Sequence, residues 1–195
     1  MNTSLRDRRR RQTAREIQTT ALKLVMEQGL HAVTTDAIAH KAGISTRTFF
    51  NYFPNKQAAL VGPLPVLEPE DCAFIATSQE PVLEDLTRAV TALLETSPPD
   101  RPTLLMLETM LDQLPEVTCT FRDTLDTIAM SISGHLQARL GPGSQWQADM
   151  MAHMTMHALG NAVRQWASTE DMPEDRIPAM VREQLLAVCE TLSAR

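Results

Sequence analysis

The stretch at residues 34–56, TTDAIAHKAGISTRTFFNYFPNK, decides the fold of this chain. It predicts a first short helix over residues 35–42, capped by one of the two threonines at its start. Gly43 follows, and glycine can adopt the left-handed conformation in which many helices end. Ser45 is a favourable N-cap for a second helix over residues 46–53, which the next proline ends. Two short helices joined by a glycine turn predict a helix-turn-helix motif.

The second helix of this motif has a buried face and an outward face. At about 100° per residue, Phe49 and Phe53 fall on one face, which predicts that both are buried. The opposite face carries a guanidinium, a hydroxyl and an amide, and an aromatic ring lies on each flank; these residues are Arg47, Thr48, Asn51, Phe50 and Tyr52. Such groups can read the major groove of DNA. The alternative is a solvated helix face, but two unshielded rings beside it favour a DNA partner.

The same residues carry a family resemblance. TTDAIAHKAGIS followed by RTFFNYFPNK resembles the DNA-binding segment of the TetR (tetracycline repressor) family, and is most similar to an actinobacterial branch with a TFF-x-YF recognition helix. The resemblance covers residues 5–62, and the rest of the chain agrees with the family in length and helical pattern. It implies an all-α fold, with an N-terminal three-helix helix-turn-helix domain and a C-terminal helical domain for ligand binding and dimerisation. It also implies a homodimer that represses transcription until a small effector releases it from operator DNA.

The resemblance further implies which side chains meet DNA. The residues expected to face bases are Thr46, Arg47, Thr48, Phe50 and Asn51, and those expected to hold phosphates are Thr35, Tyr52 and Lys56. Arg47 suits a guanine and Asn51 an adenine. Asp36 stands at the start of the first helix, where its charge is tolerable only if it caps the helix and points away from the DNA backbone.

The charge of the chain is unevenly distributed. Residues 1–60 hold ten Lys or Arg and four acidic residues, a net charge of +6, so the remainder carries −12 of the total of −6. A basic N-terminal part on an acidic body is typical of a nucleic-acid module attached to another domain. The run Arg8, Arg9, Arg10 and Arg11 is either a solvated tail or an arm that contacts phosphates or a neighbouring minor groove.

The helix that follows this arm ends near Gln28, because Gly29 is a favourable stop. Its start is open, since Thr13 and Glu16 form a capping-box pattern while the family helix often begins earlier.

Composition limits the class of protein. At 195 residues the chain can bury a sizeable core in one or two domains. Three scattered cysteines imply no disulfide framework, and we find no signal peptide and no apolar run of membrane-spanning length. We therefore expect a cytoplasmic protein. No Walker loop, dinucleotide-binding glycine pattern or nucleophile elbow is present, so neither an enzyme nor a cofactor is predicted.

The pattern after the helix-turn-helix motif predicts three parts. These are a DNA-binding domain over residues 1–61, a linker with irregular structure over 62–81, and a helical effector-binding and dimerisation domain over 82–195. Helices are expected at residues 56–61, 82–96, 103–114, 117–140, 145–168 and 173–192. Glycine and prolines interrupt the chain after Val61, at a place where many family members continue their fourth helix.

A candidate effector site comes from the methionine-rich helices of the body. Methionine lines adaptable apolar pockets, although the same residues serve equally as ordinary core. The expected lining residues are Met106, Met110, Phe121, Leu125, Met150, Met154, His157 and Asn161. This set predicts a small hydrophobic or aromatic effector with one polar group.

An alternative on the same fold is a metal- or redox-sensing regulator. His153 and His157 lie one helical turn apart and could share a metal ion, with His135 or Cys119 as a distant third ligand. Cys119 has only an arginine as a nearby charge, which favours a structural thiol.

The last two helices are the predicted dimer interface, as a four-helix bundle with those of a second copy. The final helix has a wide apolar face, and the helix before it adds three apolar residues near its end; together these are Ile177, Val181, Leu185, Leu186, Val188, Cys189, Leu192, Leu159, Val163 and Trp166. The alternative is that this face belongs to the core of one monomer.

Overall fold

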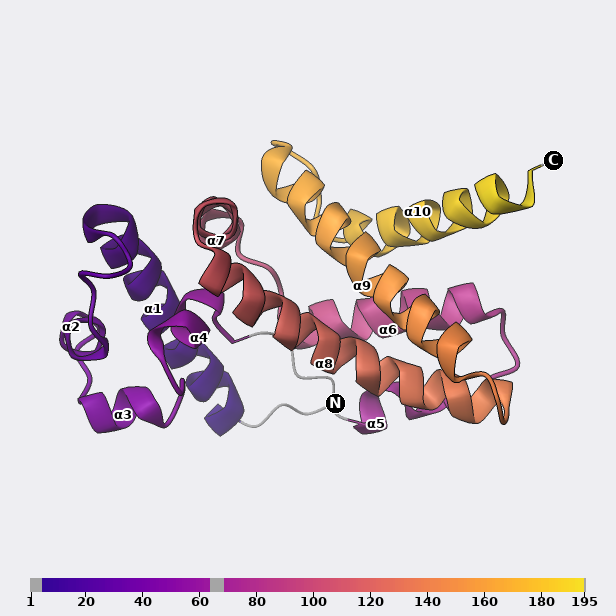
Figure 1. The fold of residues 1–195 in the computed structure, drawn as a ribbon, viewed down its shortest axis with the longest axis horizontal. Coiled ribbons are helices and arrows are strands. Elements are labelled where there is room, and N and C mark those ends of the chain that lie inside the picture. Colours follow the sequence, from indigo (N-terminus) through magenta and orange to yellow (C-terminus); the bar gives the residue numbers. More distant parts are fainter. Residues whose placement is uncertain (1–4, 64–68, 195) are drawn as a thin grey trace. The chain divides into compact units, whose positions relative to one another are not determined.

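The computed structural model describes residues 5–63 and 69–194, and within these ranges every regular element is helical (Figure 1). The predicted all-α fold is confirmed. The elements are α1 (Leu5–Gln28), α2 (Thr35–Lys41), α3 (Thr46–Phe50), α4 (Lys56–Val61), α5 (Pro69–Cys72), a 3₁₀ turn η1 (Ala73–Ala76), α6 (Val82–Thr96), α7 (Arg101–Gln113), α8 (Pro115–Leu140), α9 (Gln145–Ser168) and α10 (Arg176–Ser193). None of the helices described has the length and apolar character needed to cross a bilayer.

Several helix boundaries differ from those expected. α6 and α9 have the expected bounds, whereas α7, α8 and α10 are shifted by one to three residues. α8 begins at Pro115 because proline is well suited to the first turn of a helix. α3 is shorter than expected: Asn51 is its C-cap, and the amides of Tyr52 and Phe53 still bond the Phe49 carbonyl at 2.9 and 3.0 Å.

The chain forms two compact units. The first contains residues 1–64 and 101–123, and the second contains 65–100 and 124–195. The sequence placed everything after residue 82 in one domain, but α7 and the start of α8 pack with the first unit. Their side chains Leu107, Met110 and Val117 belong to its apolar core. The functional division at 1–61, 62–81 and 82–195 remains a prediction. Its linker includes residues 64–68, which lie outside the described ranges, and α5 and η1 occupy part of the rest.

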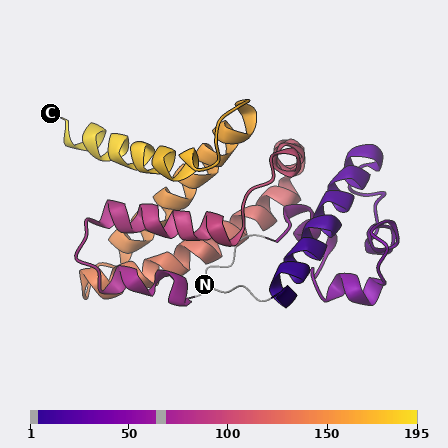
Figure 2. The ribbon, with the colours of Figure 1, turned by 180° about the vertical axis from the view of Figure 1, so that it is seen from behind.

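The first unit is built around α1, with α2 and α3 on one flank and α4 and α7 also packed against it (Figures 1 and 2). Its core includes Ile17, Ala21, Leu22, Val33, Ile38, Phe49 and Leu60, each at most 1% exposed. Gln18 is a buried polar residue of α1. Its Nε2 donates to the carbonyls of Leu60 at 3.2 Å and Val61 at 2.8 Å, and so satisfies the end of α4.

The arginine arm is helical. α1 begins at Leu5, so Thr13 lies inside the helix rather than at its N-cap. Gln12 Nε2 instead donates to Glu16 Oε1 at 2.9 Å, an i, i+4 contact of the helix surface. α1 ends as expected at Gly29, whose φ is +82°.

The second unit packs α10 against α9 and α6. Ion pairs of arginine with acidic residues connect helices of this unit. Buried Asp85 of α6 accepts hydrogen bonds from Arg139 of α8 and from the Ser78 hydroxyl, and Glu84 accepts from Arg182 Nη2 of α10 at 2.7 Å. The hydrogen bond from Arg182 lowers the pKa of Glu84 below its ordinary value. In Figures 1 and 2 the last turns of α10 run to the C terminus with no other described helix of this unit above them.

Candidate nucleic-acid interface

The turn between α2 and α3 is fixed by side-chain caps at short sequence separation. The Thr34 hydroxyl accepts from the Ala37 amide at 3.1 Å and so caps α2. The Ser45 hydroxyl accepts from the Thr48 amide at 3.0 Å and caps α3. Gly43 between them has φ +71°, a region that glycine adopts at no steric cost. These caps set the start of α3.

α3 has the two faces that its sequence predicts. Phe49 is fully buried and Phe53 is 5% exposed, and their ring centroids lie 6.2 Å apart. On the opposite face Arg47 and Asn51 are exposed. Phe50 is also exposed, at 53%. The helix therefore presents a guanidinium, an amide and an apolar ring to solvent, while two aromatic rings anchor it in the core.

Two of the residues expected to face bases have hydroxyls that are already hydrogen-bonded. Thr46 Oγ1 donates to Asp36 Oδ1 at 2.6 Å, and Thr48 Oγ1 shares a 2.8 Å hydrogen bond with Ser45 Oγ. Asp36 thus connects the start of α2 to the start of α3. The hydrogen bond from Thr46 gives the Asp36 carboxylate a structural role. The sequence had suggested that an acidic residue at this position is tolerable only if it caps the helix.

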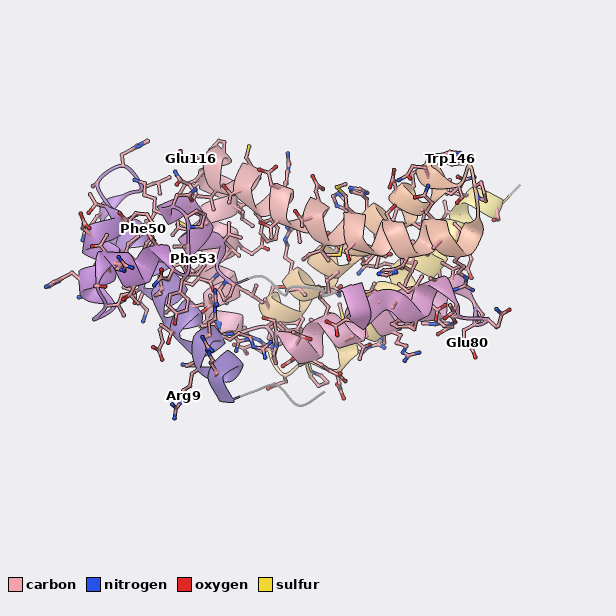
Figure 3. The ribbon with its side chains drawn as sticks, turned by 90° about the horizontal axis from the view of Figure 1, so that it is seen from below. Arg9, Phe50, Phe53, Glu80, Glu116 and Trp146 are labelled. Carbon is pink, nitrogen blue, oxygen red and sulfur yellow. The ribbon has the colours of Figure 1, made fainter. Side chains whose placement is uncertain are left out.

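A groove lies between the start of α1 and α3. Its lining residues come from α1 and from α3 with the residues just after it, and are Arg6, Arg9, Arg10, Thr13, Thr48, Asn51 and Tyr52. The Arg10 guanidinium lies over the half-buried Tyr52 ring, 5.9 Å from its centroid. In Figure 3, Arg9 lies at the start of α1 with its side chain directed away from the helix, and Phe50 lies on the helix-turn-helix part. The groove concentrates positive charge beside the outward face of α3.

Sequence reasoning missed Arg6 and Thr13 as lining residues of this groove. Both follow from extending the helix through the arginine run, since Arg6, Arg9 or Arg10, and Thr13 recur at helical spacing. Arg11 is half-buried, and the side chain of Arg8 is outside the described part of the structure.

Lys56 has an internal role that its sequence position does not reveal. Its Nζ donates to the Leu30 carbonyl at 2.6 Å and to the Val33 carbonyl at 2.9 Å. Lys56 therefore connects the start of α4 to the segment between α1 and α2. A phosphate contact by Lys56 would have to use the third N–H of the ammonium. Thr35, another predicted phosphate ligand, is half-buried at the first position of α2.

The eight candidate effector residues lie in both units. Met110 is buried in the apolar core of the first unit, and Met106 and Phe121 pack against it. Leu125 lies on the part of α8 that belongs to the second unit. The remaining four line a surface groove of about 350 Å³ between α9 and α10, together with Leu185 and Val188; they are Met150, Met154, His157 and Asn161. Met150 is 57% exposed.

We next consider the histidines and cysteines that the sequence offered as metal ligands or reactive thiols. His153 Nδ1 lies 2.7 Å from the Asp149 carbonyl, and its Nε2 lies 3.5 Å from Asp126 Oδ1. Over residues 5–63 and 69–194, no group of three or more His, Cys, Asp or Glu is positioned to hold a metal ion. Cys119 is exposed, whereas Cys72 is fully buried and burial raises its pKa to about 12.

The apolar face of α10 divides into a buried and an exposed part. Ile177, Val181 and Leu185 are buried within their own unit. Leu186, Val188 and Leu192 are 37%, 41% and 80% exposed. The predicted residues of α9 are buried or half-buried: Leu159, Val163 and Trp166. Part of the predicted interface is therefore core, and the exposed flank of α10 is the part still available to a partner.

Comparisons with known proteins agree with this fold. Residues 17–60 match the family model described as bacterial regulatory proteins, tetR family. The structure is similar to a protein assigned as a TetR-family transcriptional regulator from Mesorhizobium loti, with 16% identity, a TM-score of 0.51, and 94% of this chain and 98% of that chain covered. It is also similar to FadR of Thermus thermophilus, a TetR-family transcriptional repressor solved with lauroyl-CoA, with 21% identity, a TM-score of 0.52, and coverage of 93% and 96%. No curated protein matches the sequence.

Proposed function

We propose that this chain, whose N-terminal domain is that of the TetR family, is a DNA-binding transcriptional regulator that represses its target until a small hydrophobic effector releases it. The observation that supports DNA binding is the outward face of α3. Arg47, Phe50 and Asn51 are exposed there, beside a groove that Arg9 and Arg10 line. Assignment to the actinobacterial-type branch of this family remains part of this proposal and rests on the TFF-x-YF pattern of the recognition helix.

The groove residues and the α3 residues have different roles. Arg47 and Asn51 read base edges, because a guanidinium suits guanine and an amide suits adenine. Arg9, Arg10 and the Tyr52 hydroxyl contact the phosphate backbone of the DNA on either side of the major groove that α3 enters. Phosphate contacts of this kind position a protein without specifying sequence. The net charge of −12 beyond residue 60 disfavours docking on DNA through the rest of the chain.

The regulator acts as a homodimer through α9 and α10. One recognition helix reads only a few base pairs, so useful specificity needs a second helix related by two-fold symmetry. The exposed flank of α10 continues the apolar surface of the α9–α10 groove, where Met150 and Val188 are more than one-third exposed. A second copy that covers this face removes these side chains from water, which is favourable by about 25 cal/mol per Å² of apolar area.

The effector and the dimer partner compete for the same four candidate residues of α9. If a second copy covers the groove, Met150, Met154, His157 and Asn161 lie at the interface, and an effector that binds them acts on dimer geometry. We keep a small hydrophobic or aromatic compound as the proposed effector class. The T. thermophilus FadR structure holds lauroyl-CoA, which shares with this class only its apolar lauroyl chain, because its CoA part is a charged nucleotide.

Selection of duplexes from random DNA by the full-length chain tests DNA binding. We expect a palindromic sequence with guanine at one position of each half-site. Arg47→Ala should lose discrimination at that position and bind the operator more weakly by about 1–3 kcal/mol per half-site. Arg122→Ala, an exposed arginine of α8 that lies outside the groove and outside α9 and α10, is the matched control and should bind normally. Equal loss on every sequence for Arg47→Ala would make Arg47 a phosphate contact instead.

Sedimentation tests the dimer. Val188→Glu adds a charge to a side chain that is 41% exposed within its own chain, so the variant should fold as a helical monomer with weak operator binding. Met130→Glu, at a 69% exposed position of α8, should stay dimeric. A Val188→Glu protein that remains dimeric and binds its operator would put the interface elsewhere.

Thermal-shift screening tests the effector class. Small hydrophobic or aromatic compounds should raise the melting temperature and lower operator affinity, whereas stabilisation only by anionic sugars or nucleotides would contradict the proposal. Two variants then locate the effector site. A smaller thermal shift for His157→Ala indicates a site on α9, and a smaller shift for Met106→Ala indicates a site in the first unit.

A further inference from the structure

Phe50 is the one aromatic side chain that α3 exposes by more than half. It is 53% exposed, whereas Phe49 beside it is fully buried. The Phe50 ring meets the Phe49 ring edge-on, with centroids 5.5 Å apart and an interplanar angle of 90°. This arrangement is favourable for aromatic pairs. The buried ring therefore holds the exposed ring in place before any partner binds.

The groups around Phe50 limit what this face can recognise by hydrogen bonding. The hydroxyls of Thr46 and Thr48 are hydrogen-bonded to Asp36 and Ser45. Arg47 and Asn51 remain as exposed donors, and Phe50 lies three residues from Arg47 on the neighbouring flank. The face thus combines two hydrogen-bonding side chains with one apolar ring.

The partner that fits this combination is a DNA major groove with a thymine at the position of the ring. Among the four bases, only thymine presents an apolar group in the major groove, its C5-methyl. A wholly apolar protein partner fits less well, because Arg47 and the arginines of the adjoining groove would have to lose their hydration beside it.

We propose that Phe50 is a specificity-determining residue that recognises the methyl group of a thymine in each half-site. This inference rests on the proposed function as a DNA-binding regulator. It also assigns a position to the thymine. Residues three apart on a helix have Cβ atoms about 5–6 Å apart, and successive bases rise by about 3.4 Å, so the thymine lies within one or two base pairs of the guanine read by Arg47.

Replacement of single thymines by deoxyuridine tests the proposal, because it removes the methyl group and keeps the base pair. The probe is the operator selected from random DNA, with each thymine replaced in turn and symmetrically in both half-sites. One position should weaken binding of the unmodified protein by about three- to fourfold per half-site, which corresponds to loss of one buried methyl group. That position should lie next to, or one pair beyond, the base at which Arg47→Ala loses discrimination.

Variants then identify the residue that touches the methyl group. Phe50→Ala should bind the thymine and deoxyuridine operators equally, whereas Arg47→Ala should bind both weakly and keep the difference between them. Circular dichroism checks that Phe50→Ala is folded. If Phe50→Ala is not folded, the deoxyuridine scan with the unmodified protein still tests the proposal, because the sensitive thymine must lie at the position stated above.

The outcomes separate this inference from the proposed function. An operator that is bound specifically but is indifferent to every deoxyuridine overturns the role of Phe50 and leaves DNA binding intact. The same holds if Phe50→Ala retains the full thymine preference. If no duplex is selected at all, both proposals are wrong.

Discussion

Replacing Lys56 by methionine tests whether this residue stabilises the first unit from within. Lys56 Nζ donates to the Leu30 carbonyl at 2.6 Å and the Val33 carbonyl at 2.9 Å. Methionine keeps an apolar stem of similar length and removes all three N–H donors. The Leu30 and Val33 carbonyls then lose their hydrogen-bond donor. Both carbonyls lie in the segment between α1 and α2, which sets where α2 begins.

The expected loss follows from the two hydrogen bonds. A hydrogen bond from a charged donor contributes about 1.5–3 kcal/mol, and the site is only partly buried, so water can replace part of each bond. We expect Lys56→Met to destabilise the first unit by about 2 kcal/mol in total. Since 1.4 kcal/mol corresponds to a factor of ten, amides that exchange through opening of this unit should exchange about 30-fold faster.

Hydrogen exchange resolved along the sequence measures this effect, and the chain contains its own control. Both tryptophans, Trp146 and Trp166, lie on α9 in the second unit. Their fluorescence should therefore report an unchanged second unit while amides of residues 30–50 lose protection.

DNA binding separates an internal role for Lys56 from a phosphate contact. Arg9→Ala should reduce the slope of log K against log salt by about 0.9 per half-site with normal exchange, as expected for one lost phosphate contact in each subunit. Lys56→Met should lower affinity with little change in slope. Normal exchange together with a slope reduced by about 0.9 per half-site would show that Lys56 acts on phosphate and would refute the reasoning.

Three further predictions concern the rest of the chain. Gly62→Ala should destabilise the first unit by about 3 kcal/mol in denaturant titrations, because φ is +84° and the new Cβ would lie 2.1 Å from Gln18 Cδ, which forces out the side chain that caps α4; unchanged stability would mean that this cap is dispensable. Cys72 should react with iodoacetamide only after unfolding, unlike exposed Cys119, since burial raises its pKa to about 12; rapid labelling in the native protein would contradict the burial of Cys72 at the end of α5. The hydrogen bond from its arginine partner lowers the pKa of Glu84, so its stabilising effect is present above about pH 4.5 and is lost as pH falls through the lowered pKa. Glu84→Gln should therefore make the stability of the second unit, followed by tryptophan fluorescence, less dependent on pH in this acidic range, and an identical pH dependence would rule out this source.

Local sequence signals predicted the geometry of the helix-turn-helix correctly. Ser45 and Thr34 cap their helices through contacts three residues away, and Phe49 and Phe53 are buried as helical spacing requires. Such contacts depend on a few neighbouring residues, so a pattern in the sequence is sufficient to predict them.

Contacts between distant residues could not be predicted in this way. The acceptors of Lys56 are 23 and 26 residues away, and Thr46 meets Asp36 ten residues away. Met110 satisfies the same methionine pattern whether it lines a pocket or fills a core, and only the packing of α7 places it in the core of the first unit. The predicted base contacts remain untested, but the structure adds one fact that the sequence did not show: the hydroxyls of Thr46 and Thr48 are already hydrogen-bonded.

The first unit is made from two separate pieces of chain, and this limits how it can be transplanted. A chimaera that takes only residues 1–64 would leave behind Leu107, Met110 and Val117, and the apolar surface of α1 that they help to cover would become exposed and prone to aggregate. A functional transplant to another regulator must carry residues 101–123 as well, or supply a replacement helix with a matching apolar face. The first unit is therefore not a simple N-terminal cassette, although the residues proposed to read bases all lie within residues 47–51.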